Sequence, residues 1–418
     1  MTTSRLYRRM KPVTGGNIFT FYNPEYSAYD TSIMQATIHR GSASPQGYTP
    51  STLELEVAEA VTGPIQGKTG MLRIRETQAQ RLAAKMGVLP QEISTRFEGR
   101  MATTDVTDIS DIRKTSKITG SSWIAQMNNS PRTVLPQAGW SIKRLMQEAL
   151  NAFGIMRRGI TPEWYGDYDE VSTSEQSRLT WENTISKYVE EIGIQGRETR
   201  DGRTQFFTLE YLDSFLKTKA ATAVPIGRHQ AVSPASWQIL NSRPPASLRY
   251  TVTAEGGYLA TREIEASSYT GEMVEIDTKD WAHIKTVTRQ TGIYARKLVN
   301  QQSISTFTVP TIKVDISLLI RLGDSYSLKL AGYLLKLETW DPIGFTGDWP
   351  SRLQGWHVAT GITETISPDG WIIELSLTPW ASALGSFPPP TPAPVIWDQA
   401  SGTWDQASGT WESFVLGE

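Results

Sequence analysis

The residue types that most often carry catalysis are scattered in this chain. Four histidines lie far apart and show no metal-ligand spacing such as H-E-x-x-H: His39, His229, His283 and His357. Cysteine is absent, which excludes disulfides, thiolate metal ligands and cysteine nucleophiles. The sequence contains neither a G-x-S-x-G nucleophile motif nor a phosphate-binding glycine loop. We therefore expect no catalytic residues, no metal site and no cofactor.

Acidic residues offer two further candidates, and neither has the spacing that its chemistry needs. Asp105, Asp108 and Asp111 form a spaced run without the glycine and the distal glutamate of a calcium loop, which favours a solvated face. Glu190 and Glu191 are adjacent on a predicted helix, where neighbouring side chains point in different directions. They are poor candidates for an acid and base pair, so we expect that the protein is not an enzyme.

A repeat late in the sequence indicates binding more clearly than any residue indicates catalysis. Trp397-Asp-Gln-Ala-Ser-Gly-Thr recurs unchanged from Trp404 and begins a third time at Trp411. Tryptophan is a large amphipathic anchor of the kind that carries binding energy at interfaces. The predicted partner-binding residues are the three pairs of tryptophan and acid: Trp397, Asp398, Trp404, Asp405, Trp411 and Glu412. The alternative is a disordered end or a cloning remnant, since exact duplication also arises by replication slippage.

The segment before this repeat predicts a spacer. Residues 386–396 are proline-rich, and Pro388, Pro389 and Pro390 favour the extended polyproline II conformation. The seven-residue period does not indicate a coiled coil, because each unit offers one large apolar side chain and contains a glycine. We expect the repeat to be held away from the body of the protein.

Composition indicates a globular protein with several domains. The 418 residues are 39% hydrophobic and 20% charged, which is enough to bury a substantial core, and the formal net charge is −2. This balance predicts no whole-surface attraction to DNA or membrane. The basic N-terminal arm, residues 1–16, lacks the apolar stretch of a signal peptide, and nowhere do eighteen apolar residues run together. We expect neither secretion nor a membrane span.

Two regions have the period-two alternation of strands. The first, 17–129, contains the predicted strands Ile33–Gly41, Leu53–Val57, Met71–Arg75 and Thr95–Met101. In the second, 221–385, the runs Leu328–Leu337, Gly361–Ile366 and Trp371–Leu377 also read as β, and Ser367–Gly370 predicts a hairpin turn between the last two. Trp371, Ile373, Leu375 and Leu377 should share a buried face.

The region between them, 130–220, predicts an α+β unit. A helix is expected over Ile142–Phe153, with Ser141 as its cap, because apolar residues recur there at helical spacing. A second helix is expected over Trp181–Ile192, and Arg200–Arg203 reads as a hairpin turn.

The order of these pieces resembles the tail hub, or tail-associated baseplate, proteins of long-tailed phages. The segments that carry the resemblance are Arg40-Gly41, Thr49-Pro50 before Leu53–Val57, Phe97–Arg100, the helix from Ile142, Trp181-Glu182, Arg200–Gly202, Ile366–Trp371 and Leu375–Pro379. The Trp-Asp units separately resemble the ends of minor tail proteins from siphophages of actinobacteria.

The resemblance implies a mainly β, α+β virion protein made in the host cytoplasm. It implies a homotrimer whose tube-type β-barrels form a six-fold-like ring at the tail tip below the distal tail protein, near the tape measure protein. Other minor tail proteins would bind the repeats, and DNA would pass transiently through the channel. The implied units are an arm at 1–16, a first barrel at 17–129, an inserted α+β domain at 130–220, a second barrel at 221–385, a linker at 386–396 and a docking tail at 397–418.

A second class of function stays open. Exposed aromatic residues such as Trp164, Tyr165 and Trp349 could stack on sugars in a carbohydrate-binding or cell-wall-degrading tail-tip protein.

Overall fold

The computed structural model places about half of the chain in defined elements. It describes residues 19–23, 27–29, 33–41, 49–57, 69–110, 113–127, 133–135, 137, 140–152, 162–168, 180–181, 194–232, 238–239, 247–253, 259–265, 273–277, 307–308, 311–345, 349, 355–367 and 370–380. The N-terminal arm, the proline-rich linker and the Trp-Asp tail lie outside these residues.

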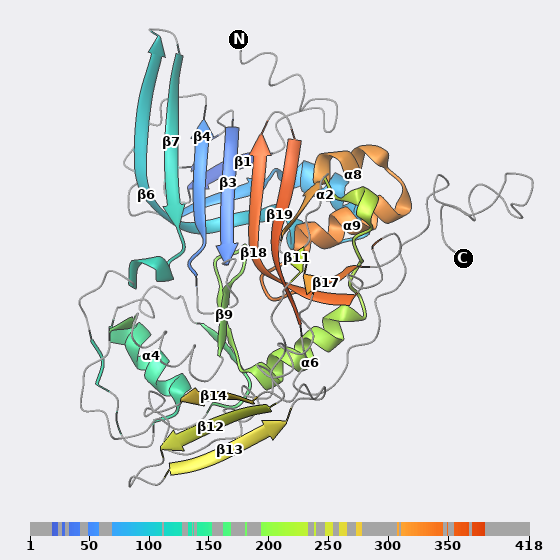
Figure 1. The fold of residues 1–418 in the computed structure, drawn as a ribbon. Coiled ribbons are helices and arrows are strands. Elements are labelled where there is room, and N and C mark those ends of the chain that lie inside the picture. Colours follow the sequence, from blue (N-terminus) through green and yellow to red (C-terminus); the bar gives the residue numbers. More distant parts are fainter. Residues whose placement is uncertain are drawn as a thin grey trace, which may run out of the picture.

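An antiparallel sheet of eleven strands forms the main body (Figure 1). In spatial order its strands are β16 (Thr311–Asp315), β19 (Gly370–Pro379), β18 (Gly355–Ser367), β3 (Ile33–Gly41), β4 (Thr52–Val57), β7 (Arg113–Ser121), β6 (Thr95–Ser110), β5 (Thr69–Ile74), β1 (Phe19–Asn23) and β2 (Ser27–Tyr29), with β17 (Pro342–Phe345) also paired to β18. The mainly β class predicted from the sequence is confirmed, while closure into a barrel stays a prediction.

Alternation of apolar and polar residues explains why these segments are strands. In β4, Leu53 and Leu55 are fully buried, whereas Glu54 between them faces outward. In β19 the predicted inward face is confirmed, because Trp371, Ile373, Leu375 and Leu377 are all buried. The hairpin predicted at Ser367–Gly370 joins β18 to β19, and its two end residues pair with each other.

Strands from both predicted β regions share one sheet and one core. Strand β3 from the first region pairs with β18 from the second, matching Ala36 with Ile366 and Ile38 with Glu364. Their buried side chains form a single hydrophobic cluster, so the paired strands of the two regions belong to one sheet. The physical reason is that each region leaves an edge strand free to pair with the other. The positions of the domain borders stay predictions.

The sheet contains two sets of four strands with the same pairing order. In the first set β4 pairs with β7, β7 with β6 and β6 with β5. In the second, β16 pairs with β19, β19 with β18 and β18 with β17. Every one of these pairs is antiparallel, so each half of the chain builds the same four-stranded topology in the same chain order.

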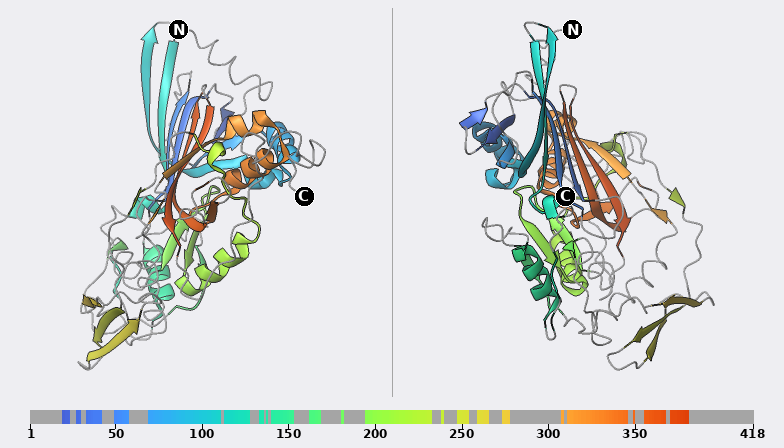
Figure 2. Two further views of the ribbon diagram at one scale, coloured as in Figure 1. Left: turned by 45° about the vertical axis from the view of Figure 1, so that its right-hand side comes forward. Right: turned by 90° about the vertical axis from the view of Figure 1, so that its left-hand side faces the viewer.

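Four helices pack beside the sheet, and one corrects a prediction. They are α2 (Glu76–Met86), α3 (Pro90–Ser94), α8 (Ile316–Leu322) and α9 (Ser325–Lys336) (Figures 1 and 2). The run Leu328–Leu337 was predicted as β but belongs mainly to α9. Its buried residues Leu330, Ala331, Leu334 and Leu335 follow helical spacing. The side chain of Asp324 caps the helix by accepting from the amide of Ser327 at 2.8 Å.

The inserted region has its own smaller core at the end of the sheet opposite the β6–β7 hairpin tip (Figures 1 and 2). The predicted helix is present as α4 (Ile142–Ala152), and the hydroxyl of Ser141 accepts from the Arg144 amide at 3.2 Å. Of the second predicted helix only Trp181 is described, and it is helical and buried. The other elements of this region are β8 (Glu163–Tyr165), β9 (Gln195–Glu198), β10 (Thr204–Phe207) and α6 (Leu209–Ala220), and the short helices η1 (Ile124–Met127) and η4 (Arg228–Gln230) precede and follow it.

The hairpin predicted at Arg200–Arg203 joins β9 to β10, and the Thr199 amide donates to the Arg203 carbonyl at 2.9 Å.

Two small sheets complete the described chain. One pairs β11 (Gln238–Ile239) with β15 (Phe307–Thr308), and the other holds β13 (Leu259–Glu265), β12 (Ser247–Thr253) and β14 (Met273–Asp277).

Candidate functional site

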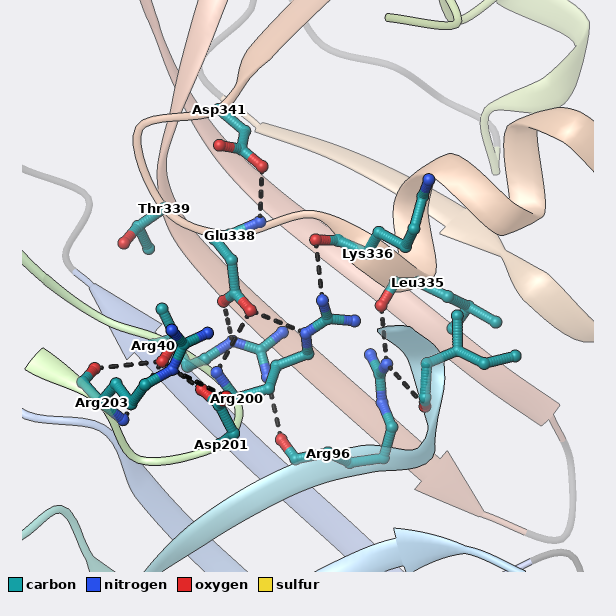
Figure 3. A network of polar contacts seen from close by, with 12 residues as sticks. Arg40, Arg96, Arg200, Asp201, Arg203, Leu335, Lys336, Glu338, Thr339 and Asp341 are labelled. Carbon is teal, nitrogen blue, oxygen red and sulfur yellow. Dashed lines mark hydrogen bonds and ion pairs between the residues drawn. The ribbon is translucent and has the colours of Figure 1, made fainter. Parts of the chain in front are cut away.

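The six residues predicted from the sequence to bind a partner, Trp397 to Glu412, lie outside the described residues, so the structure neither gathers nor separates them. The described part of the chain instead contains a network of buried charges where the two β regions and the inserted region meet (Figure 3).

The centre of the network is an ion pair between β6 and β18. The Nε and Nη2 atoms of Arg96 donate to the two carboxylate oxygens of Glu364 at 2.8 and 2.7 Å, and both side chains are fully buried. The indole of Trp371 donates to the same carboxylate at 2.8 Å. Arg96 also donates to the Leu335 carbonyl at the end of α9, at 2.7 Å. A single guanidinium therefore connects two strands and a helix.

Arg40 connects this pair to the next one. It lies on β3, donates from Nη1 to the Arg96 carbonyl at 3.0 Å, and its other nitrogens lie 3.7 Å from Glu364 and 3.9 Å from Glu338. Glu338 accepts from both the backbone amide and the Nε of Arg200, at 3.2 and 2.7 Å (Figure 3). Arg200 belongs to the β9–β10 turn, so this contact binds the inserted region to the segment after α9.

A third cluster of charges, around Asp341, also connects the inserted region to the segment after α9. Asp341 accepts from Arg197 at 3.1 Å and from Lys219 of α6 at 2.9 and 3.0 Å. Arg197 also donates to Gln205 and to the Thr339 carbonyl. The carboxylate of Asp341 further accepts from the amide of Glu338 at 3.0 Å, which makes the three clusters continuous.

Electrostatics keep the network ionised. Burial raises the pKa of the Glu364 carboxyl, but Arg96 and Arg40 outweigh it and the net pKa lies below the usual value. Burial likewise opposes ionisation of Glu338, and Arg200 and Arg40 outweigh it, so its pKa is also lowered. Burial lowers the pKa of Arg40 to about 10, with Glu338 and Glu364 opposing that shift. These carboxylates are therefore charged at neutral pH. Both oxygens of Glu364 accept hydrogen bonds, whereas Glu338 accepts through Oε1 and its Oε2 lies 3.9 Å from Arg40, and this pairing suits a structural connection rather than proton transfer.

A polar cleft of about 800 Å³ lies beside the network, between α3, the β9–β10 turn, α6 and the end of α9. Its lining includes six cationic and four acidic side chains: Arg73, Arg197, Arg200, Arg203, Lys219, Lys336, Glu92, Asp201, Glu338 and Asp341. The cleft is a candidate binding surface for an anionic group.

Of the residues considered for catalysis from the sequence, two described histidines, His39 and His357, lie in different surroundings. Within the described chain His39 is exposed on β3 and hydrogen-bonds to Thr363, whereas His357 is buried on β18 against the ring of Phe345. His283 and the predicted pair Glu190 and Glu191 lie outside the described residues. No group of three or more potential metal ligands occurs in the part of the chain that the structure describes. Among those residues no helix is long and apolar enough to cross a membrane.

The aromatic residues considered for sugar binding are packed. Trp349 is 2% exposed, and its indole donates to the Ile226 carbonyl at 2.8 Å. The ring of Trp164 stacks on Phe206 with 4.8 Å between centroids, and the ring of Tyr165 stacks on Phe207 at 5.1 Å. Trp349 cannot stack on a sugar, and the other two rings already have a face covered.

Comparison with known proteins identifies the fold. Neither a protein-family model nor a curated protein matches the chain. Among solved structures, the 43 kDa tail protein of prophage MuSo2 from Shewanella oneidensis is similar with a TM-score of 0.54 at 12% identity, over 87% of this chain and 98% of that one. A tail protein from Neisseria meningitidis MC58 is similar with a TM-score of 0.53 at 10% identity, over 89% of this chain and 99% of that one.

The chain therefore has the fold of prophage tail proteins. The resemblance seen in the sequence is confirmed at this coarser level. The narrower likeness to the hubs of actinobacterial siphophages stays a prediction.

Proposed function

We propose that the protein is a structural component of a phage tail, a trimeric hub at the tail tip that closes or extends the tail tube below the distal tail protein. The observation that carries the proposal is the repeated strand topology. The sets β4 to β7 and β16 to β19 have the same antiparallel pairing order. Three copies of a chain with two similar units present six similar units around one axis, which matches three-fold parts to a six-fold tube.

The buried charge network fits this role. A hub carries load between its neighbours, and its β regions and inserted region must keep a fixed relation for the ring to form. Arg96 with Glu364 joins the two β regions, and Arg200 with Glu338 joins the inserted region to them. Such pairs fix geometry more than they add stability.

We further propose that the Trp-Asp tail, residues 397–418, anchors other minor tail proteins, that the tape measure protein lies nearby, and that DNA crosses the channel during ejection. Repetition of the anchor favours avidity, since several weak contacts on one strand bind a partner more tightly than one. The carbohydrate-binding or wall-degrading alternative is not favoured, because the aromatic rings that it would use are packed.

The test is the oligomeric state of the purified protein. Light scattering coupled to gel filtration should give a trimer, and class averages from electron microscopy should show a ring with six similar lobes around a channel. A monomer at micromolar concentration in the presence of the distal tail protein would contradict the hub. A release assay on host cell walls should give no soluble sugar or free amine above a mock control.

A further inference from the structure

We infer that the cleft beside the charge network is the docking site of a Trp-Asp unit from the same polypeptide. The inference concerns the cleft and the tail only, so it holds or fails independently of the proposed trimer.

The charge of the cleft is the first part of the argument. Two of its acidic side chains, Glu338 and Asp341, are buried and already bonded within the network. Among its cations, Lys336 has only a long ion pair, 3.7 Å from Glu92, and its side chain is 36% exposed. Lys219 is exposed to the same extent and keeps a third N–H beyond its two bonds to Asp341. The exposed edge of the cleft therefore offers donors to a carboxylate that comes from elsewhere.

The composition of the tail is the second part. From Ser386 onward the sequence contains four acidic residues and no lysine or arginine: Asp398, Asp405, Glu412 and Glu418. In each of the three units the acid directly follows a tryptophan. Arginine and lysine recognise both members of such a pair, because a cation attracts the face of an indole as well as a carboxylate. A Trp-acid pair thus fits a cationic cleft better than an acid alone.

The position at which the chain leaves the body is the third part. The last described residue, Trp380, packs its ring against Trp340, the neighbour in sequence of the cleft residue Asp341. Its indole donates at 2.8 Å to Asp213 of α6, the helix that carries Lys219. The last described residue therefore contacts α6 and the segment that holds Asp341, both of which contribute to the lining of the cleft. The 17 residues from Trp380 to Trp397 reach up to about 55 Å when extended, so the length of the chain allows the first Trp-Asp unit to reach the cleft.

Docking of one unit leaves the other two for a partner. A tethered unit is present at an effective concentration of about a millimolar. Even a weak site in the cleft would therefore be occupied by the chain's own unit, without a separate partner protein in solution. The cleft then fixes where the tail begins, and the remaining units project from a defined point.

Zero-length carbodiimide cross-linking of the full chain, read by mass spectrometry, tests the inference. We expect amide links from Lys336 or Lys219 to Asp398, Asp405 or Glu412, and their loss in 1 M salt, because the contact is between partly exposed charges. Lys336→Gln should lose the links at its position. Lys329→Gln is the matched control, since Lys329 is an exposed residue of the same helix outside the cleft. Links spread evenly over lysines remote from the cleft, such as Lys117 and Lys313, would overturn the inference.

Hydrogen exchange provides a second measurement that needs no lysine. The full chain with Asp398→Asn, Asp405→Asn and Glu412→Gln should exchange faster than the unaltered chain at residues 91–95 and 199–205, with unchanged rates in β4. Equal rates in the cleft would contradict docking. Cross-linking a mixture of nitrogen-15-labelled and unlabelled protein tells links within one chain from links between two chains. Cross-linked peptide pairs that carry a single isotope indicate docking within the same polypeptide. Mixed-isotope links would overturn that assignment.

Discussion

Arg96 and Glu364 are 268 residues apart in sequence and form a two-bond ion pair in which neither side chain is exposed. Arg96 lies on β6 and Glu364 on β18, so the pair spans the two β regions near the point where β3 and β18 join them. Removing a charge from such a pair leaves the other charge buried without compensation, which costs more than the pair itself contributes.

Glu364→Gln should therefore destabilise the protein by about 3–5 kcal/mol, because it removes the charge and preserves the shape. The double variant Arg96→Met with Glu364→Leu should cost clearly less than the sum of the two single changes, since each single change leaves the charge of the other member of the pair without its partner. Urea unfolding of the unaltered protein, Arg96→Met, Glu364→Leu and the double variant measures the coupling. Lys117→Gln breaks the exposed pair with Glu54 and should change stability by about 0.5 kcal/mol or less. Additive single and double changes would contradict the role of the pair.

Acid should destabilise the folded state through His357 before it affects the carboxylates. Burial lowers the pKa of His357 to about 4, from 6.5 in an exposed histidine, and among the described residues neither ring nitrogen has a hydrogen-bond partner. The folded state binds this proton less readily than the unfolded state, so stability is full above about pH 6.5 and falls as the pH drops toward 4. The total loss is about 3 kcal/mol.

Thermal unfolding between pH 7 and pH 5 measures the effect of His357. His357→Leu should flatten the pH dependence in this window, and His39→Gln, which removes an exposed histidine, should keep it. Because the pKa values of Glu338 and Glu364 are lowered in the folded state, these carboxylates add a further loss of stability only below about pH 4.5, where they take up protons. An unchanged slope in His357→Leu would show that another group is responsible.

Two glycines with positive φ should respond very differently to alanine. Gly41 ends β3 at a φ of 71°, and a Cβ atom there would lie 2.2 Å from the Thr360 carbonyl oxygen. Gly87 follows α2 at a φ of 66° with no atom within 4 Å of the same position. Gly87→Ala carries only the conformational cost, about 1 kcal/mol, whereas Gly41→Ala adds a backbone clash and should cost about 3 kcal/mol or more. Comparable unfolding midpoints for the two variants would contradict the close approach of β3 and β18.

Much of the sheet was predictable because its signals are local. The alternation in Leu53–Val57 and Trp371–Leu377 defines an inward face without reference to any other strand. The helix α9 was missed because its apolar residues are dense enough to fit either the strand period or the helix period. The decisive signals were Gly323 and the capping residue Asp324, which come directly before the helix.

The charge network left a signal that sequence reasoning missed. Arg40 occupies the same inward face as Ala36 and Ile38, and Glu364 lies between the inward Ile362 and Ile366. A charged residue at an inward position of a strand indicates a buried partner. The identity of that partner could not be predicted, because the pairing depends on which strands lie side by side, and the two members of the Arg96–Glu364 pair are 268 residues apart in sequence. The predicted binding tail at Trp397 to Glu412 remains untested, because it lies outside the described residues.

The last prediction concerns that tail. Truncation after Pro390 should leave the body folded and oligomeric, because it keeps every residue of the three cores that the structure describes. The truncated protein, assembled into particles, should lose one downstream tip protein. A single change such as Trp404→Ala should cost about 2 kcal/mol at one contact and leave the partner bound, whereas replacing Trp397, Trp404 and Trp411 together should release it. Quantitative mass spectrometry of purified particles measures the partner, with Phe414→Ala as a control outside the Trp-acid pairs. Particles that keep every tip protein and full infectivity after truncation would show that the repeats serve no docking function and arose by slippage.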